Sequence, residues 1–132
     1  MNFPLFRILL CAALLALQCT LPTSARAEPK VLGSGESVDL GAVFWTDGCS
    51  STLITIVGVD LLEGPPGVKL SVRGEDVVPG KQDCPKVPGG MVVASVKEVR
   101  APVTATLKYR VRYKTANGSR QSEHSVELSL QP

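Results

Sequence analysis

Few side chains in this sequence are of the types that carry out catalysis. His124 is the single histidine, and Glu75, Asp76 and Asp83 form the densest group of carboxylates. General acid–base catalysis by carboxylates needs two of them held at a set distance on rigid elements. These three lie in a stretch rich in glycine, proline and lysine, which predicts solvated loop charges rather than a catalytic pair.

The remaining residues give little support for a hydrolytic or metal site. The chain has no Gly-x-Ser-x-Gly elbow for a serine nucleophile. Met91 and His124, taken as copper ligands, would lack a clustered third donor. We therefore predict no metal, no cofactor and no enzymatic activity. An enzyme is the third-ranked hypothesis, and it would require a cleft around His124.

The first 27 residues have the order of a secretory signal peptide. A positive charge at Arg7 precedes an apolar run over residues 8–21, and a small-x-small motif ends at Ala27. About 14 apolar residues are too few to cross a hydrocarbon core that needs about 20 residues of helix. We expect cleavage between Ala27 and Glu28, a periplasmic or secreted location, and a mature form that does not span the membrane.

Removal of this segment changes the cysteine count and the charge. Cys11 and Cys19 leave with it, and the bulky Gln18 argues against a lipid anchor on Cys19. Cys49 and Cys84 remain, and two cysteines in an exported chain predict one disulfide. Two of the fourteen basic residues also leave, so twelve basic and twelve acidic residues remain. A neutral domain lacks the field that attracts nucleic acid, which we exclude as a partner.

The rest of the chain has the pattern of short strands. Runs of Val, Ile, Leu and Thr are separated by Gly, Pro and Asp. Alternation of Val38, Leu40, Ala42 and Phe44 predicts one strand, and residues 52–60, apolar on nearly both faces, predict a buried central strand. Further strands are expected at residues 68–73, around Val77, and at residues 91–100, 103–115 and 120–130.

The last two of these segments predict a long hairpin. Asn117 and Gly118 lie between them and form the preferred pair for a two-residue turn. The register counted outward from Ala116 opposite Ser119 gives one apolar and one charged face. It predicts these opposed pairs: Arg112 and Glu123, Lys108 and Glu127, Val111 and His124, Tyr109 and Val126, Leu107 and Leu128.

The whole pattern predicts a signal peptide over residues 1–27, a flexible tail over 28–36 and one β-sandwich domain over 37–132. About seven short strands at this spacing favour an antiparallel sandwich of two sheets. A small β-barrel is the alternative.

Several local motifs occur in a characteristic order along the chain. Phe44-Trp45 leads into Gly48-Cys49-Ser50, residues 64–68 read Gly-Pro-Pro-Gly-Val, Cys84 follows, and residues 109–113 form a Tyr-x-Val-x-Tyr strand. With the export signal, this order resembles small bacterial periplasmic proteins that have an immunoglobulin-like sandwich. The resemblance implies that fold and a role in binding, adhesion or structure. The tryptophan precedes both cysteines, unlike in true immunoglobulin domains, so we expect the disulfide to join two loops, or a strand end and a loop.

Three residues are candidates for contact with a partner. Trp45, the only tryptophan, is out of phase with the strand before it, so it either packs against the disulfide or forms an exposed aromatic anchor. Arg110 and Lys114 have no acidic partner in the predicted register, so they belong either to a solvated sheet face or to a contact surface.

We therefore predict an exported, non-enzymatic, immunoglobulin-like domain that mediates protein–protein contacts in the cell envelope, with an envelope or extracellular protein as partner. The alternative is a small secreted inhibitor or ligand-binding module that uses the disulfide-braced loop of residues 74–89.

Overall fold

The computed structural model describes residues 28–80 and 83–132, and the predicted signal peptide lies outside the described residues. Within the described ranges the chain forms strands and loops without a helix. The strands are β1 Lys30–Gly33, β2 Ser37–Val43, β3 Thr46–Asp47, β4 Ser50–Ser51, β5 Leu53–Glu63, β6 Val68–Val77, β7 Val87–Val96, β8 Val103–Thr115 and β9 Gly118–Gln131.

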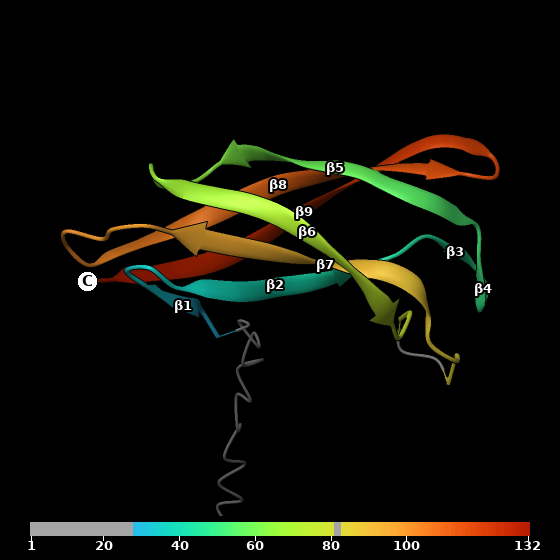
Figure 1. The fold of residues 1–132 in the computed structure, drawn as a ribbon, viewed down its shortest axis with the longest axis horizontal. Helices are drawn as coiled ribbons and strands as arrows, with labels where there is room; N and C mark the ends of the chain where they lie inside the picture. The colour runs from blue at the N-terminus through green and yellow to red at the C-terminus, as the bar shows by residue number, and fades with distance from the viewer. Residues whose placement is uncertain (1–27, 81–82) are drawn as a thin grey trace, which may run out of the picture.

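Two main sheets make up the domain (Figure 1). One has the order β1-β9-β8-β5 and the other has the order β2-β7-β6, while β3 and β4 form a separate short hairpin. All pairs are antiparallel except β1 with β9, which is parallel. The two sheets do not close on one another, so the barrel alternative is wrong and the two-sheet prediction is confirmed.

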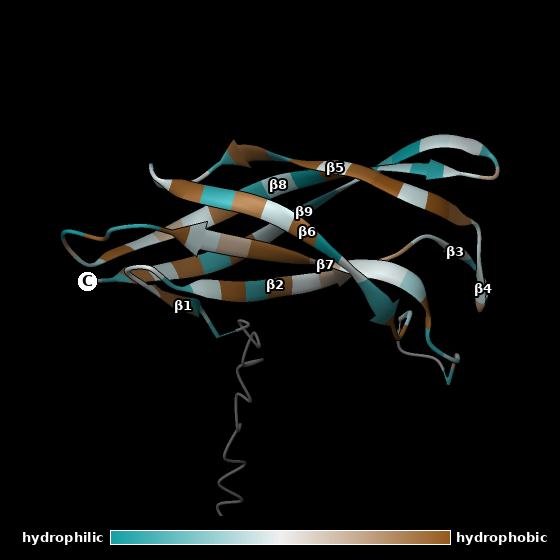
Figure 2. Ribbon diagram, in the orientation of Figure 1, coloured by the Kyte–Doolittle hydropathy of each residue, from teal (hydrophilic) through white to brown (hydrophobic). Residues whose placement is uncertain are grey.

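The core lies between the two sheets and follows the alternation of the strands. Buried and more exposed residues alternate along β8 from Leu107 to Thr115, and Figure 2 shows β8 changing between hydrophobic and hydrophilic colours. Tyr109 reaches across from β8, and its hydroxyl lies 3.7 Å from where a Cβ on Gly41 of β2 would be. The buried apolar cluster consists of Leu32, Leu40, Val43, Val68, Val92, Ala94, Val96, Val99, Leu107, Tyr109, Val111, Tyr113, Leu128 and Leu130.

The predicted flexible tail over residues 28–36 is wrong over Lys30–Gly33. These residues form β1, and Leu32 is fully buried in the core. The glycines and charges nearby hid this strand, because only one of its four residues is inward-facing and buried.

The predicted alternation in β2 is interrupted. A β-bulge lies between Asp39 and Gly41, so the phase of the strand changes there. As a result Val43 is buried while Ala42 is exposed. A strict period of two cannot anticipate a bulge, because the extra residue leaves no mark on the alternation before it.

The predicted buried central strand is also wrong, because β5 is an edge strand. Its register against β8 shifts three times, which leaves Ile54, Val57 and Leu62 as the extra residues of three bulges. These side chains are 62%, 56% and 44% exposed. The apolar residues on both faces of this segment therefore belong to a bulged edge strand and not to a buried central strand.

The boundaries of β7 and of the last hairpin differ from the prediction in detail. β7 runs from Val87 to Val96, earlier than the expected 91–100, and pairs along the whole of β6. In the hairpin, Thr115 pairs with Gly118, so every cross-strand partner is displaced by two residues. A shift of two keeps each side chain on its predicted face but changes its partner.

The geometry of the turn explains the displacement. Only Gly118 has a positive φ there, at 108°, so Ala116 and Asn117 are the central residues. The Thr115 hydroxyl donates a hydrogen bond to the Gly118 carbonyl oxygen at 2.8 Å and accepts one from the Asn117 N–H at 3.2 Å. The threonine side chain therefore stabilises this turn in place of an Asn-Gly turn with two positive φ angles.

Candidate functional site

The outward face of the four-stranded sheet carries a row of charges on β8 that is matched by acids on both neighbouring strands. On the β5 side, Arg112 binds Asp60 through two nitrogens, at 2.8 and 3.3 Å, and Lys108 lies 3.5 Å from Glu63. Exposed ion pairs of this kind contribute about 0 to 1 kcal/mol each. Along most of its length, the positive and negative charges of this face are paired and exposed to solvent.

The predicted lack of an acidic partner for Arg110 is wrong. Its Nη2 donates to Glu123 Oε1 at 2.8 Å on β9, because the true register sets these two residues opposite one another. Glu127, expected opposite Lys108, instead accepts a hydrogen bond from Thr106 at 2.6 Å. Arg110 is therefore engaged within the sheet, and any role in binding a partner stays a prediction.

The pairing of cations with acids ends at the tip of the β8–β9 hairpin. No acidic side chain in the described ranges pairs with Lys114 or Arg120, and the Arg120 guanidinium donates only to the carbonyl of its neighbour Ser119, at 3.0 Å. The structure therefore gives Lys114 the free charge that the sequence predicted, and it adds Arg120, which sequence reasoning missed.

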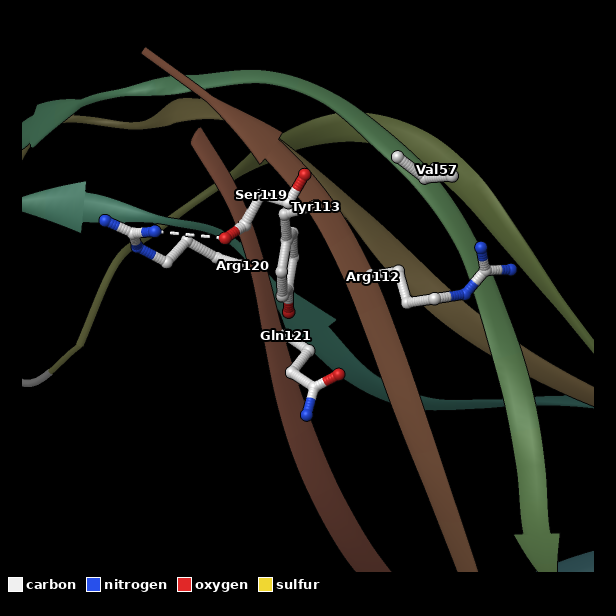
Figure 3. A pocket seen from close by; sticks show the side chains of 6 residues that line it. All are labelled: Val57, Arg112, Tyr113, Ser119, Arg120 and Gln121. Carbon is white, nitrogen blue, oxygen red and sulfur yellow. Dashed lines mark hydrogen bonds between the residues drawn. The ribbon is translucent and has the colours of Figure 1, made fainter. Parts of the chain in front are cut away.

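A concavity of about 480 Å³ lies beside these cations (Figure 3). Figure 3 shows Arg112 extending past β5 and Gln121 below the Tyr113 ring. The concavity is lined by Val57, Arg112, Tyr113, Ser119, Arg120 and Gln121. The hollow combines the exposed side chain of Val57 and the Tyr113 ring with guanidinium and amide groups, so it offers both apolar and cationic contacts.

The hairpin tip belongs to a larger set of loops at one end of the molecule, opposite the C-terminus (Figure 1). We call this the distal end and define it as the β3–β4 hairpin, the described parts of the loop of residues 78–86, which are 78–80 and 83–86, and the β8–β9 turn. The Ala116 N–H donates to the Thr52 carbonyl at 2.9 Å, and the Thr52 N–H donates to the Trp45 carbonyl at 3.1 Å. These bonds join the turn to the β3–β4 hairpin.

The disulfide connects the remaining loop to the same end. Cys49, in the β3–β4 turn, is bonded to Cys84 in the loop of residues 78–86, with 5.2 Å between their Cα atoms. The prediction that the disulfide joins loops is therefore confirmed. Since Val78 in this loop is 51% exposed, the bridge braces segments that face solvent.

Trp45 packs into this end rather than standing out from it. Its ring centroid lies 5.3 Å from that of Tyr113, tilted by 51°. The side chain is half-buried against the core. Its aromatic neighbour is thus Tyr113 of the opposite sheet, and an exposed anchor at Trp45 is not what this geometry favours.

A chain of three hydrogen-bonding side chains runs along the inner face of the hairpin. The hydroxyls of Tyr113 and Ser122 are 2.7 Å apart, and Ser122 Oγ lies 2.8 Å from His124 Nε2. The His124 ring stacks on Tyr109, with centroids 5.2 Å apart. Sequence reasoning set His124 on the correct face but opposite Val111, which is wrong, because His124 pairs with Tyr109 and Ser122 pairs with Val111.

Burial shifts the titration of these groups. It lowers the pKa of His124 below its ordinary 6.5 and raises the pKa of Tyr109. Burial also raises the pKa of Tyr113, against the opposing effect of its hydrogen bond with Ser122. Burial therefore favours the neutral form of His124, whose Nε2 shares a hydrogen bond with Ser122. A serine–histidine pair resembles part of a hydrolytic triad, but no described carboxylate hydrogen-bonds to the imidazole.

The predicted loop carboxylates lie away from the hydrogen bonds that join Tyr113, Ser122 and His124. Glu75 and Asp76 lie on β6, where Arg73 binds Glu75 at 3.5 Å and Asp39 at 3.2 Å. Asp83 lies in the loop beside Cys84. Within residues 28–80 and 83–132 no cluster of three or more metal-ligating side chains occurs, and no helix is long and apolar enough to cross a membrane.

Comparison with known proteins identifies no relative of this chain. No protein-family model, curated protein or solved structure matches this chain.

Proposed function

We propose that this chain is an exported, non-enzymatic, immunoglobulin-like domain whose distal end binds an acidic surface of another protein in the cell envelope. The observation that carries the proposal is the unbalanced charge at the hairpin tip. Arg120 lines the concavity, and Lys114 pairs with Ser119, which also lines it. The other cations of β8 are matched by acids on the neighbouring strands. Complementary charge of this kind favours selective encounter with an acidic partner.

The order of the strands supports the immunoglobulin-like assignment. In such sandwiches the second, fifth and fourth strands form one sheet and the third, sixth and seventh form the other. With the short β3–β4 hairpin counted as a loop, β2-β7-β6 and β5-β8-β9 follow that order. The first strand differs, because β1 pairs with the last strand instead of the second.

The brace across the distal end supports a binding role in an oxidising compartment. The disulfide and the Ala116–Thr52–Trp45 hydrogen bonds fix three loops relative to one another. Loops fixed in advance lose less conformational entropy when a partner binds.

The test compares two single charge reversals in recovery of envelope proteins. Lys114→Glu changes the tip, and Lys69→Glu changes an exposed lysine on β6, in the other sheet. We expect a protein that is recovered by the wild type and by Lys69→Glu but lost with Lys114→Glu. Equal recovery with both variants contradicts the proposed surface.

A second function, a small secreted inhibitor, is favoured by one observation. The loop of residues 78–86 is braced by the disulfide and presents the exposed Val78. Such a loop would insert into the cleft of a target enzyme. Loss of inhibition on replacement of Val78 by Ser, with Lys114→Glu having no effect, would favour this function over the first.

A further inference from the structure

One edge of the four-stranded sheet is regular and open. β1 pairs with β9 only over Leu128–Gln131, so among the described strands none covers the same side of β9 over residues 118–127. Pairing between β8 and β9 has no register shift along its whole length. Directly before β1, Pro29 has no N–H to donate, which ends the parallel pairing at that point. The side of β9 that faces away from β8 is therefore open over ten residues, without a bulge.

The other edges carry features that discourage pairing. β5 has three bulges, and β2 has one between Asp39 and Gly41. β6 is regular, but it presents the exposed cations of Lys69 and Arg73 and contains Gly74. Lysine on an edge protects it, and glycine weakens a strand. Residues 118–127 carry one exposed cation, Arg120, contain no lysine and have glycine only at their start, so among the described edges this one has the fewest protecting features.

We propose that residues 118–127 of β9 pair antiparallel with the same residues of a second copy of this chain, on a twofold axis through Ser122. The pairing joins two four-stranded sheets into one sheet of eight strands. This inference goes beyond the proposed function and does not rest on it. Twofold dimers that use one self-complementary patch are the commonest oligomers of soluble proteins.

The register follows from the geometry of identical strands. Side chains opposite one another share a face, so the axis of an antiparallel pair must pass through a residue. Only axes at Ser122 or Glu123 keep the open edge almost fully overlapped. An axis at Glu123 sets two carboxylates directly opposite each other, which is unfavourable.

An axis at Ser122 avoids opposed like charges. It sets Gln121 opposite Glu123 of the second copy, and Ser119 opposite Ser125, so amide and hydroxyl groups meet acceptors. Arg120 lies opposite His124 of the second copy, and burial lowers the pKa of that imidazole and so favours its neutral form. The region from residue 28 onward has equal numbers of acidic and basic residues, so overall repulsion between copies is absent.

The first experiment tests the register by cross-linking. Chains with Ser119→Cys and chains with Ser125→Cys are oxidised separately and as an equimolar mixture. Ser119 and Ser125 lie on the outward face of β9 and are exposed. We expect a covalent dimer in the mixture, containing one chain of each kind, and little in either single variant. Absence of this mixed dimer, or equal dimer in a single variant, overturns the proposal.

The second experiment measures dimer strength by sedimentation of the chain from residue 28 over about 1 to 500 µM. A single strand pairing buries less than a standard interface, so a weak dimer is expected. Gln121→Lys creates two Lys–Glu pairs per dimer and should tighten it by about 2- to 30-fold, while Gln121→Glu should weaken it by a similar factor. A monomer at every concentration, or equal effects of the two substitutions, refutes the proposal.

Discussion

Replacement of Thr115 by Val tests the turn that sets the register of the longest hairpin. The two side chains have nearly the same shape, and Thr115 is only 3% exposed, so the change removes a buried hydroxyl with little change in packing. Two hydrogen bonds are lost, one to the Gly118 carbonyl and one from the Asn117 N–H. Each contributes about 0.5 to 1.5 kcal/mol net, so we expect a loss of about 1 to 3 kcal/mol.

The assay is thermal unfolding followed by circular dichroism or calorimetry. For a domain of this size 1 kcal/mol corresponds to about 4–8 °C in Tm. Asn117→Ala is the matched control, because Asn117 has an ordinary negative φ in this turn and its side chain makes no hydrogen bond within the described residues. We expect its effect to stay within about 0.5 kcal/mol.

The opposite ranking would refute this account. If Asn117→Ala costs more than Thr115→Val, then Asn117 occupies a position that needs a positive φ, and the Asn117–Gly118 turn is the correct one. The partner of every residue in β8 and β9 would then move by two, including the Arg110–Glu123 ion pair.

Three further predictions concern the disulfide, the histidine and the packing of the sheets. The double variant Cys49→Ser and Cys84→Ser should lose on the order of 4 kcal/mol in urea unfolding, since the bridge closes a loop with a sequence separation of 35; an unchanged midpoint contradicts this. Because burial lowers the pKa of His124, the unfolded state binds the proton more readily, so the free energy of unfolding should fall as the pH drops below about 6.5. His124→Gln should remove that part of the pH dependence, which is measured as the free energy of unfolding at several pH values. Gly90→Ala should cost about 1 to 3 kcal/mol, because its Cβ would lie 2.7 Å from Ile56 and 2.8 Å from Val72. Gly74→Ala has no atom within 4 Å, so it is the control, and a similar loss at both glycines would show that backbone effects dominate.

Periodicity in the sequence predicted the elements whose alternation is uninterrupted. The strand over Val103–Thr115 begins and ends where expected, and its inward residues are the buried ones. The disulfide between Cys49 and Cys84 followed from compartment and count alone. Both depend on local composition, which the sequence displays directly.

The errors arose where a tertiary feature overrides local pattern. Bulges at Leu40 and along β5 change phase without a marker in composition. The strand Lys30–Gly33 exists because Leu32 fills a place in the core beside β9, a long-range contact. The hairpin register was wrong because the hydroxyl of Thr115 competes with the turn preference of Asn-Gly, and side-chain capping of this kind is not visible in spacing.

The same register decides what the candidate site is. With the predicted pairing, Glu123 and Glu127 would neutralise Arg112 and Lys108, and Arg110 and Lys114 would both be free. In the structure Glu123 neutralises Arg110, and the cations of the hairpin without an acidic partner among the described residues are Lys114 and Arg120 at the tip. A two-residue displacement thus moves the unpaired charge from the middle of β8 to the tip of the hairpin.

The two proposals have a joint geometric consequence. In an antiparallel pairing about Ser122, the hairpin tip of each copy lies toward residue 127 of the other, so the two distal ends point in opposite directions. A dimer would therefore present two copies of the cationic tip at its two extremities, and it could not bring both to one small partner. It could connect two partners, or two sites on an extended one, and binding would then strengthen through effective concentration without any new contact. Gln121→Glu weakens the dimer but also changes the lining of the concavity, so it should reduce retention on a surface densely coated with the partner by a larger factor than it reduces the affinity for a single soluble partner molecule. Equal factors in the two formats would show that the loss comes from the concavity and not from the dimer.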